Sequence, residues 1–141
     1  MYNYDIKKTM KRAYTGNVST FFNTKFLSHD EEYFKFEVTF SSETINPFGI
    51  IQGGMISSAL DEVTSITVNL VTNDAMLPSS TDLHTSFHRP VKPGKAIIKT
   101  KIIKLGKNVV SIEGKLFNSE NKIAASVLHS GILTKLMWSN K

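Results

Sequence analysis

Residues 53–72, GGMISSALDEVTSITVNLVT, are the stretch that decides the fold. Apolar side chains recur in it at spacings of three and four, which is the period of an α-helix with a broad apolar face. The residues on this face are Met55, Ile56, Ala59, Leu60, Val63, Ile66, Leu70 and Val71. We therefore expect one long helix that ends near Thr72 and that other elements must cover. The following segment 73–79 contains Pro78 and is expected to break it.

The segments on either side of this helix have the alternating pattern of strands. Over residues 33–41, every second side chain is a large apolar one, which predicts a half-buried strand. After the helix we expect strands at 80–89, 96–105, 109–117 and 123–134, joined by short turns. In the strand at 80–89, Leu83, Thr85 and Phe87 are expected on one face, and Asp82, His84, Ser86 and His88 on the other.

This order of elements predicts a single α+β domain over residues 1–141. An antiparallel sheet curled around one long helix would cover the apolar face of that helix. The open edges of such a sheet pair readily with another copy, so a symmetric dimer or larger assembly is expected. At the N-terminus, residues 3–14 predict a short amphipathic helix within an extension over residues 1–15. The basic residues Lys7, Lys8, Lys11 and Arg12 are interpreted as its solvated face rather than as a ligand site.

Composition excludes several kinds of site. The chain has no cysteine, which rules out disulfides, thiolate zinc sites and a cysteine nucleophile. No apolar run approaches the roughly 20 residues that span a bilayer, and the first residues lack the apolar core of a secretory signal. A cytoplasmic location is expected. The net charge of +5 favours a polyanionic partner, either nucleic acid, an acidic membrane or a phosphate-rich small molecule.

Two features of the helix suggest chemistry. Gly53 and Gly54 stand where loop becomes helix, and the unpaired N–H groups there could stabilise an oxyanion; a simple tight turn explains the glycines equally well. Asp61 lies eight residues into the helix, four after Ser57, on a polar strip beside the apolar face. It is either a functional carboxylate or an ordinary exposed helix acid. Glu62 is expected to face solvent or a subunit contact.

The segments NPFGIIQGGMISSALDEVTS (46–65) and SSTDLHTSFHRPVKPGKAIIKTKIIKLGKNVVSIEGKLF (79–117) resemble the phenylacetate-degradation (PaaI-type) branch of the hotdog-fold thioesterase superfamily. The resemblance runs from about Phe34 to Leu133. The loop-to-helix motif of that family reads N-x-x-G-x-x-H-G-G, followed by an acid eight residues after the first glycine. Asn46, Gly49, Gly53, Gly54 and Asp61 match it in register. Gln52 stands where the family has histidine, and it cannot titrate near neutral pH as histidine does.

The resemblance implies a hotdog fold and acyl-coenzyme A thioester hydrolysis. Asp61 would be the nucleophile or the general base for a water. The Gly53 N–H would polarise the thioester carbonyl, and Asn46 would help to place the thioester or the water. Ser80 would orient that water from across a dimer interface. The active enzyme would be a dimer or a homotetramer with shared sites, needing neither metal nor cofactor beyond the coenzyme A of the substrate.

Basic residues offer contacts for the phosphates of coenzyme A. Candidates for substrate binding are Gly54, Arg89, Lys104, Gly106 and Lys107; taken singly, each lysine is explained as well by simple solvation. Phe48, Met55, Met76 and Phe87 could line an acyl pocket or serve as core. His84 and His88 share a strand face without an acidic partner, which is weak evidence for metal.

Three other functions compete with hydrolysis. The substitution at Gln52 leaves a non-catalytic acyl-CoA-binding protein as the alternative function. Acyl-chain dehydration is disfavoured because the loop histidine it needs is absent. Nucleic-acid binding ranks lower still, because no aromatic and basic surface motif accompanies the charge.

Overall fold

The computed structural model describes residues 3–136. Its helices are α1 (Ile6–Ala13), α2 (Asn17–Phe21) and α3 (Gly53–Val71), with a short 3₁₀ turn η1 (Ser42–Thr44). Its strands are β1 (Lys25–His29), β2 (Phe34–Phe40), β3 (Met76–Phe87), β4 (Gly94–Leu105), β5 (Val109–Phe117) and β6 (Ile123–Lys135). They form one antiparallel sheet in the order β1-β2-β4-β5-β6-β3.

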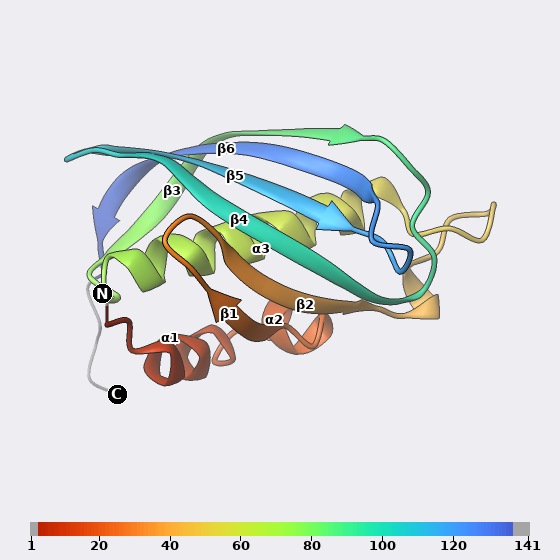
Figure 1. Ribbon diagram of the computed structural model, residues 1–141, viewed down its shortest axis with the longest axis horizontal. Coiled ribbons are helices and arrows are strands. Elements are labelled where there is room, and N and C mark those ends of the chain that lie inside the picture. Colours follow the sequence, from red (N-terminus) through yellow and green to blue (C-terminus); the bar gives the residue numbers. More distant parts are fainter. Residues whose placement is uncertain (1–2, 137–141) are drawn as a thin grey trace.

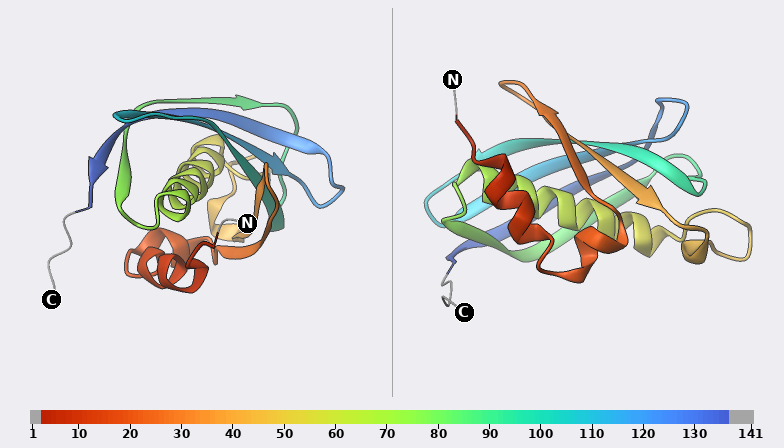
Figure 2. Two further views of the ribbon diagram at one scale, coloured as in Figure 1. Left: turned by 60° about the vertical axis from the view of Figure 1, so that its left-hand side comes forward. Right: turned by 90° about the horizontal axis from the view of Figure 1, so that it is seen from below.

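The sheet curls around α3, as Figure 1 shows, and α1 and α2 cover the side of α3 that faces away from the sheet (Figure 2). One long helix wrapped by an antiparallel sheet confirms the expected hotdog architecture. The helix α3 occupies the middle layer because most of its apolar face and both of its threonines are buried, while Met55 and Val71 at its two ends are partly buried. The buried Thr67 hydroxyl, for example, donates to the Val63 carbonyl and bonds to the Thr100 hydroxyl, so no polar group is left unpaired there.

The alternation predicted for residues 33–41 is confirmed in β2. Its even-numbered side chains, Phe34, Phe36, Val38 and Phe40, are buried against the core. Burying a side chain of this size contributes about 1.5–3 kcal/mol. The odd-numbered positions, among them Lys35, lie on the outer face of the sheet, which turns away from α3. The other predicted strands and the long helix are also present, with ends shifted by a few residues.

Two strands differ from the sequence-based expectation, and the short helix α2 is not predicted by it. The strand β1 is missing from the prediction, because the apolar stretch 19–27 shows no clear alternation and Ser28-His29-Asp30 resembles a turn, whereas Ser28 and His29 belong to the strand. The strand β3 begins at Met76 rather than Ser80, so Pro78 lies within a strand, paired with Leu133. Proline is tolerated there because β3 is an edge strand, where a missing N–H leaves no ladder partner unsatisfied.

The N-terminal helix is fixed to the end of α3 through Asp74. The buried Asp74 carboxylate accepts a hydrogen bond from the Thr9 hydroxyl (2.9 Å) and pairs with Arg12 (3.4 Å). Lys7, Lys8 and Lys11 are exposed, which confirms their interpretation as a solvated face, whereas Arg12 departs from it. None of the helices within residues 3–136 has the length and apolarity needed to cross a membrane.

Candidate active site

One side of α3 runs along the edge strand β3, and its contacts define the candidate site. Gly53, Ser57 and Asp61 follow one another at intervals of four residues and form what we call the Gly53–Ser57–Asp61 strip. At the start of the strip, Gly53 lies against the ring of Phe87; a Cβ on this glycine would come within 3.2 Å of that ring. In the middle, the Ser57 hydroxyl bonds to the Thr85 hydroxyl. Asp61 ends the strip beside a buried histidine of β6.

This histidine, His129, is the centre of a polar cluster. Its side chain is only 1% exposed, and it contacts three polar groups. Nε2 lies 2.7 Å from the Ser80 hydroxyl and 3.9 Å from Asp61 Oδ1, while Nδ1 lies 2.8 Å from the Thr64 hydroxyl. The Asp61 side chain is 49% exposed. A solvent-accessible carboxylate therefore stands beside a fully enclosed imidazole.

The hydrogen bonds of Thr64 indicate which nitrogen of His129 carries the proton. The Thr64 hydroxyl lies 2.7 Å from the Leu60 carbonyl and 3.1 Å from the Asp61 carbonyl, so it donates to the helix backbone. Its oxygen is then left to accept from Nδ1–H. Nε2 consequently carries the lone pair and accepts from the Ser80 hydroxyl. This arrangement leaves the Ser80 oxygen able to accept a further hydrogen bond on the Asp61 side of the cluster.

Burial lowers the pKa of His129, because the enclosed site disfavours the charged imidazolium. The nearby carboxylates of Asp61 and Asp82 oppose this shift without overcoming it. His129 is therefore neutral at neutral pH, in agreement with the tautomer that the hydrogen bonds require. A neutral imidazole can hold Ser80 in place while leaving the negative charge of Asp61 unpaired.

A bulge in β3 brings Ser80 to this cluster. Strict alternation would put Ser80 on the same face as Asp82, away from the core. In the structure the pairing with β6 shifts between Ser80 and Asp82, with Ser80 opposite Gly131 and Asp82 opposite Ser130. The extra residue changes the parity of the strand. Both Ser80 and Leu83 can then face α3, and Leu83 and Thr85 lie on one face of the strand as predicted, the face that meets α3 and the core.

The start of α3 forms a second group. Gln52 is the N-cap, and its side-chain Oε1 accepts a hydrogen bond from the Met55 N–H (3.1 Å). Gly53 and Gly54 are the first two residues of α3, and neither has a positive φ, so the backbone conformation itself does not require glycine at either position. Gly54 instead leaves room for the Gln52 side chain, whose Oε1 would lie 2.8 Å from a Cβ at this position. The N–H groups of Gly53 and Gly54 have no acceptor within the part of the chain that the structure describes.

Asn46 shapes the loop that leads to this helix start. Its side-chain oxygen accepts hydrogen bonds from the Phe48 N–H (2.9 Å) and the Ile50 N–H (3.4 Å). Its backbone N–H donates to the Ile50 carbonyl at 2.7 Å. The side-chain oxygen of Asn46 is thus occupied within its own loop, and only the N–H groups of its side-chain amide remain to meet a ligand.

The two groups are well separated within one chain. Gly53 and Asp61 are eight residues apart on α3, which corresponds to about 12 Å along the helix axis. The expectation that Ser80 lies across a subunit boundary from Asp61 does not match the arrangement within one chain, where His129 joins them. In one chain, Asp61, Ser80 and His129 form one group, and Asn46, Gln52, Gly53 and Gly54 form the other.

The neighbour of Asp61 departs from its predicted position. Glu62 was expected to face solvent or a subunit contact. Its carboxylate instead turns towards α2, where it accepts a hydrogen bond from the buried Ser19 hydroxyl (2.5 Å). Burial raises the pKa of Glu62, although the Ser19 hydrogen bond opposes the shift. Of the two adjacent acids, only Asp61 lies on the Gly53–Ser57–Asp61 strip.

The predicted coenzyme A contacts lie at opposite ends of the sheet. The Arg89 guanidinium donates to the Ile123 carbonyl at the start of β6 (2.6 Å). Lys104, Gly106 and Lys107 surround the turn between β4 and β5, at the far end of the strands. About 25 Å of strand separates the two ends. One chain therefore cannot bring Arg89 and these lysines to the same phosphate group.

The four apolar residues proposed for an acyl pocket do not form one within a chain. Phe48 is 87% exposed in its loop, and Met76 packs against a separate part of the core. An apolar hollow of about 320 Å³ is found instead between α2 and the first two turns of α3. It is lined by Asn17, Val18, Phe21, Phe22, Met55 and Ser58.

No group of three or more histidine or acidic side chains within residues 3–136 is arranged to hold a metal ion. That the reaction needs no metal stays a prediction. His88, one of the two histidines considered for this role, bonds to the Ser126 hydroxyl instead. Sequence reasoning missed His129 and Thr64. The one available signal was a polar side chain between Val127 and Gly131 on the inward-facing positions of an otherwise apolar strand.

Several known proteins are similar to this chain in sequence. A Saccharolobus solfataricus protein bearing the name of an esterase is 26% identical over 125 residues, which cover 89% of this chain and 87% of that protein. The proofreading thioesterase EntH of Klebsiella pneumoniae is 26% identical over 86 residues, covering 61% of this chain and 63% of EntH.

Solved structures share the fold. A phenylacetic acid degradation-related protein of Ralstonia eutropha has a TM-score of 0.82 at 25% identity, covering 92% of this chain and 99% of its own. A hypothetical thioesterase protein of Streptococcus pneumoniae, solved with coenzyme A, has a TM-score of 0.76 at 14% identity, covering 89% of this chain and 97% of its own. The family description "Thioesterase superfamily" matches residues 48–125, which is more than half of the chain. The protein therefore belongs to the thioesterase superfamily and is by class a thioester hydrolase.

Proposed function

We propose that the protein hydrolyses acyl-coenzyme A thioesters to the free acid and coenzyme A, with Asp61 as the catalytic carboxylate. The observation that carries the proposal is the cluster in which a half-exposed Asp61 stands 3.9 Å from His129, which in turn holds Ser80 at 2.7 Å. A carboxylate with unpaired charge and access to solvent can attack a carbonyl carbon or take a proton from an attacking water.

Ser80 and His129 act on the water rather than on the thioester. The Ser80 hydroxyl donates to His129 Nε2, so its oxygen can accept one hydrogen of a water that lies between Ser80 and Asp61. Asp61 accepts the other hydrogen and becomes protonated as the water oxygen bonds to the thioester carbon. Collapse of the tetrahedral intermediate breaks the C–S bond, and the proton held by Asp61 passes to the departing thiolate.

The oxyanion of that intermediate would be stabilised by the Gly53 N–H. This donor has no acceptor in the described residues and stands at the positive end of α3. A thioester carbon about 3–3.5 Å from the nucleophile cannot also reach an N–H about 12 Å away along the same helix. The complete site therefore combines Asp61, Ser80 and His129 of one protomer with Asn46 and Gly53 of another, whose helix start is capped by Gln52. The open edge strand β3, which borders the strip, is the natural place for two protomers to pair.

Coenzyme A is supported as the carrier by two points. The Streptococcus pneumoniae neighbour was solved with it, and this chain carries the positive charge that a phosphorylated carrier requires. In a dimer, Arg89 of one protomer and the Lys104–Lys107 turn of the other need not be 25 Å apart. The apolar hollow beside the first turns of α3 is the proposed resting place of the acyl group.

The test is thiol release from aryl-, medium- and long-chain acyl-CoAs with the wild type, Asp61→Asn and Glu62→Gln. We expect Asp61→Asn to lower kcat by a factor of about 10³ or more, as loss of a catalytic group does. It should leave the unfolding midpoint nearly unchanged, because the side chain is half exposed. Glu62→Gln is the matched control, since it removes the adjacent charge on the other side of the helix, and it should retain turnover.

An Asp61→Asn protein with wild-type kcat would overturn the mechanism. A folded wild type that binds coenzyme A but releases no thiol from any substrate would instead establish the non-catalytic binding protein that the Gln52 substitution left open.

A further inference from the structure

Three lysines form a row on the outer face of the sheet, the face that turns away from α3. Lys35 of β2 pairs directly with Lys99 of β4, and Lys99 pairs directly with Lys115 of β5. Their neighbours along each strand point inward to the core. The row spans two strand spacings, or about 10 Å.

Two of the three lysines in this row make no ion pair at contact distance within the described part of the chain, although the Asp30 carboxylate is close enough to Lys99 to interact with it electrostatically. Lys115 pairs with Glu113 of its own strand (3.2 Å), but neither Lys35 nor Lys99 has an ion pair with an acid within residues 3–136. Lys99 instead lies 5.2 Å from the centre of the Phe117 ring. Like charges directly opposite one another destabilise a sheet, so folding alone gives no reason for the arrangement.

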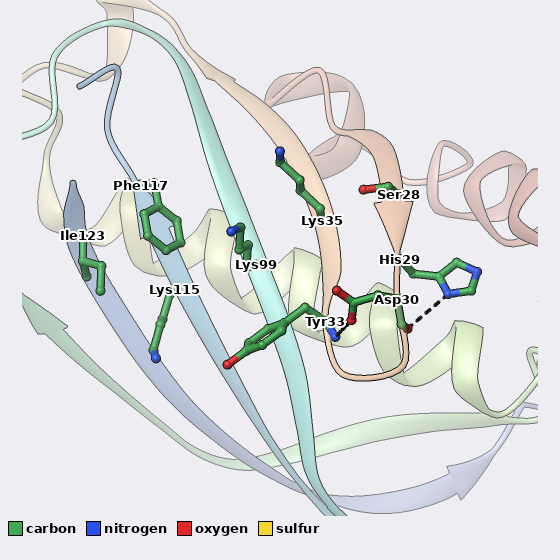
Figure 3. Close-up of a pocket in the computed structure, with 9 residues that line it drawn as sticks. All are labelled: Ser28, His29, Asp30, Tyr33, Lys35, Lys99, Lys115, Phe117 and Ile123. Atoms are coloured by element: carbon green, nitrogen blue, oxygen red, sulfur yellow. Dashed lines mark hydrogen bonds between the residues drawn. The ribbon is translucent and has the colours of Figure 1, made fainter. Parts of the chain in front are cut away.

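The row forms the floor of a hollow of about 390 Å³, shown in Figure 3. Ser28 of β1 and Asp30 of the β1–β2 turn border it. The Asp30 carboxylate faces the hollow, but it accepts hydrogen bonds from the N–H groups of Glu32 (2.8 Å) and Tyr33 (2.7 Å). Those bonds hold it at the rim.

The two sides of the row differ in chemistry. Phe117 and Ile123 lie next to it on one side and give an apolar surface, while Tyr33 lies on the other side with its hydroxyl group. An aromatic ring could rest on Phe117 and Ile123 while a chain of anionic groups followed the lysines towards Ser28. The volume is within the range of small-molecule sites.

We propose that this hollow binds a nucleoside carrying two or more phosphates. The phosphate groups lie along Lys115, Lys99 and Lys35, so that each lysine can meet a different part of the phosphate chain. The base packs on Phe117 and Ile123. The site is separate from the Asp61 cluster, because the hollow is on the outer face of the sheet and the Asp61 cluster is on the inner face, between the sheet and α3. The inference does not depend on the proposed hydrolysis.

The test is calorimetric titration of the full chain with ADP, pyrophosphate and adenosine at low salt. ADP should bind more tightly than pyrophosphate, and adenosine should bind weakly. Lys35→Met and Lys99→Met keep the apolar stems and remove the charges, and each should weaken ADP binding about tenfold or more. Lys95→Met is the matched control: it lies on the same face of β4 outside the hollow, paired with Glu37 (3.8 Å), and should leave ADP binding unchanged.

A second readout separates binding from structure. Without ligand, Lys99→Met should raise the thermal midpoint, because it relieves repulsion between neighbouring lysines; a lysine needed for folding would lower it. Absence of ADP binding, or ADP binding unaffected by Lys35→Met and Lys99→Met, would overturn the proposal.

The same nucleotide chemistry could arrive as a free nucleotide or as the nucleotide end of coenzyme A. Titration with coenzyme A, with and without saturating ADP, distinguishes these sources. If ADP and coenzyme A compete, and Lys99→Met abolishes this competition, the hollow binds the nucleotide end of coenzyme A. Simultaneous binding assigns it to a free nucleotide.

Discussion

The imidazole of His129 makes three different contacts at the residue scale, and each has a consequence. Thr64 fixes its tautomer, Ser80 receives its orientation from Nε2, and Asp61 remains 3.9 Å away without a hydrogen bond. His129 is therefore a positioning residue, because it acts on the water through Ser80 and leaves the charge of Asp61 available.

The first prediction at this scale concerns pH and stability. Burial places the pKa of His129 in the folded protein below its ordinary value of 6.5. The unfolded chain therefore binds a proton more readily than the folded chain as pH falls below about 6.5. This residue's contribution to the free energy of unfolding is complete above that pH and is lost progressively below it. Urea unfolding of the wild type should show this loss between pH 7.5 and 5, and His129→Gln should lack it.

The same variant tests the positioning role. His129→Gln leaves Ser80 without its acceptor and should lower kcat at pH 7.5 with little change in KM. It should also destabilise the fold by about 1–3 kcal/mol, as loss of a buried hydrogen-bonded group does. A His129→Gln enzyme with unchanged kcat and lowered stability would mean that the histidine serves the fold alone.

At the scale of the element, the first turn of α3 can be tested for its backbone donor. Gly53→Pro removes the N–H at the first helical position, where proline is well tolerated. The extended backbone of Gln52 (φ −63°, ψ 135°) suits a residue before proline. We expect kcat for thiol release to fall about 10²–10³-fold, the usual effect of losing one oxyanion donor.

Gly53→Ala is the control for this change. Both substitutions add a Cβ that meets the Phe87 ring, but only proline removes the N–H. Phe87 is 54% exposed and can shift by the few tenths of an ångström required. Gly53→Ala should therefore retain most of its activity, and equal losses in the two variants would mean that packing against Phe87, not the donor, is what matters.

Gln52 is the N-terminal cap of the same helix. Its side chain receives the Met55 N–H, so Gln52→Ala should lower the free energy of unfolding by about 1 kcal/mol. Thermal unfolding and thiol release measured on the same samples check this. A large loss of kcat with an unchanged unfolding midpoint would instead make Gln52 a catalytic residue, in the place that the family's histidine occupies.

At the scale of the whole molecule, a site shared between protomers predicts complementation. Asp61→Asn lacks the carboxylate and Gly53→Pro lacks the donor, so each homodimer is inactive. In a hybrid dimer, one of the two sites combines the Asp61 of the Gly53→Pro protomer with the Gly53 of the Asp61→Asn protomer. Random pairing makes half of the dimers hybrids, each with one intact site of two. Co-expression should therefore restore about a quarter of wild-type activity.

The background for that measurement is the activity of Asp61→Asn purified alone. Activity of the co-expressed pair no higher than this background, with hybrids demonstrated by differently tagged chains, would place the complete site within a single protomer.

The sequence by itself determined the features that depend on neighbours along the chain. The periods of three to four and of two predicted α3 and five of the six strands, because they follow from how successive side chains point in a helix or a strand. The same helical period placed Ser57 and Asp61 on one strip, and Ser57 indeed meets β3 there. The motif spacing indicated the family through residues that lie within twenty positions of one another.

Only the tertiary structure decided which distant residues meet. His129 reaches Asp61 because β6 pairs with β3 and β5 in one particular register, which depends on the packing of the whole sheet. The bulge after Ser80 reverses the parity that alternation predicts, so no local pattern could place this hydroxyl beside His129. The lysine row likewise exists because three strands are aligned at Lys35, Lys99 and Lys115. Local periodicity gives the direction of a side chain, whereas strand register decides its partner.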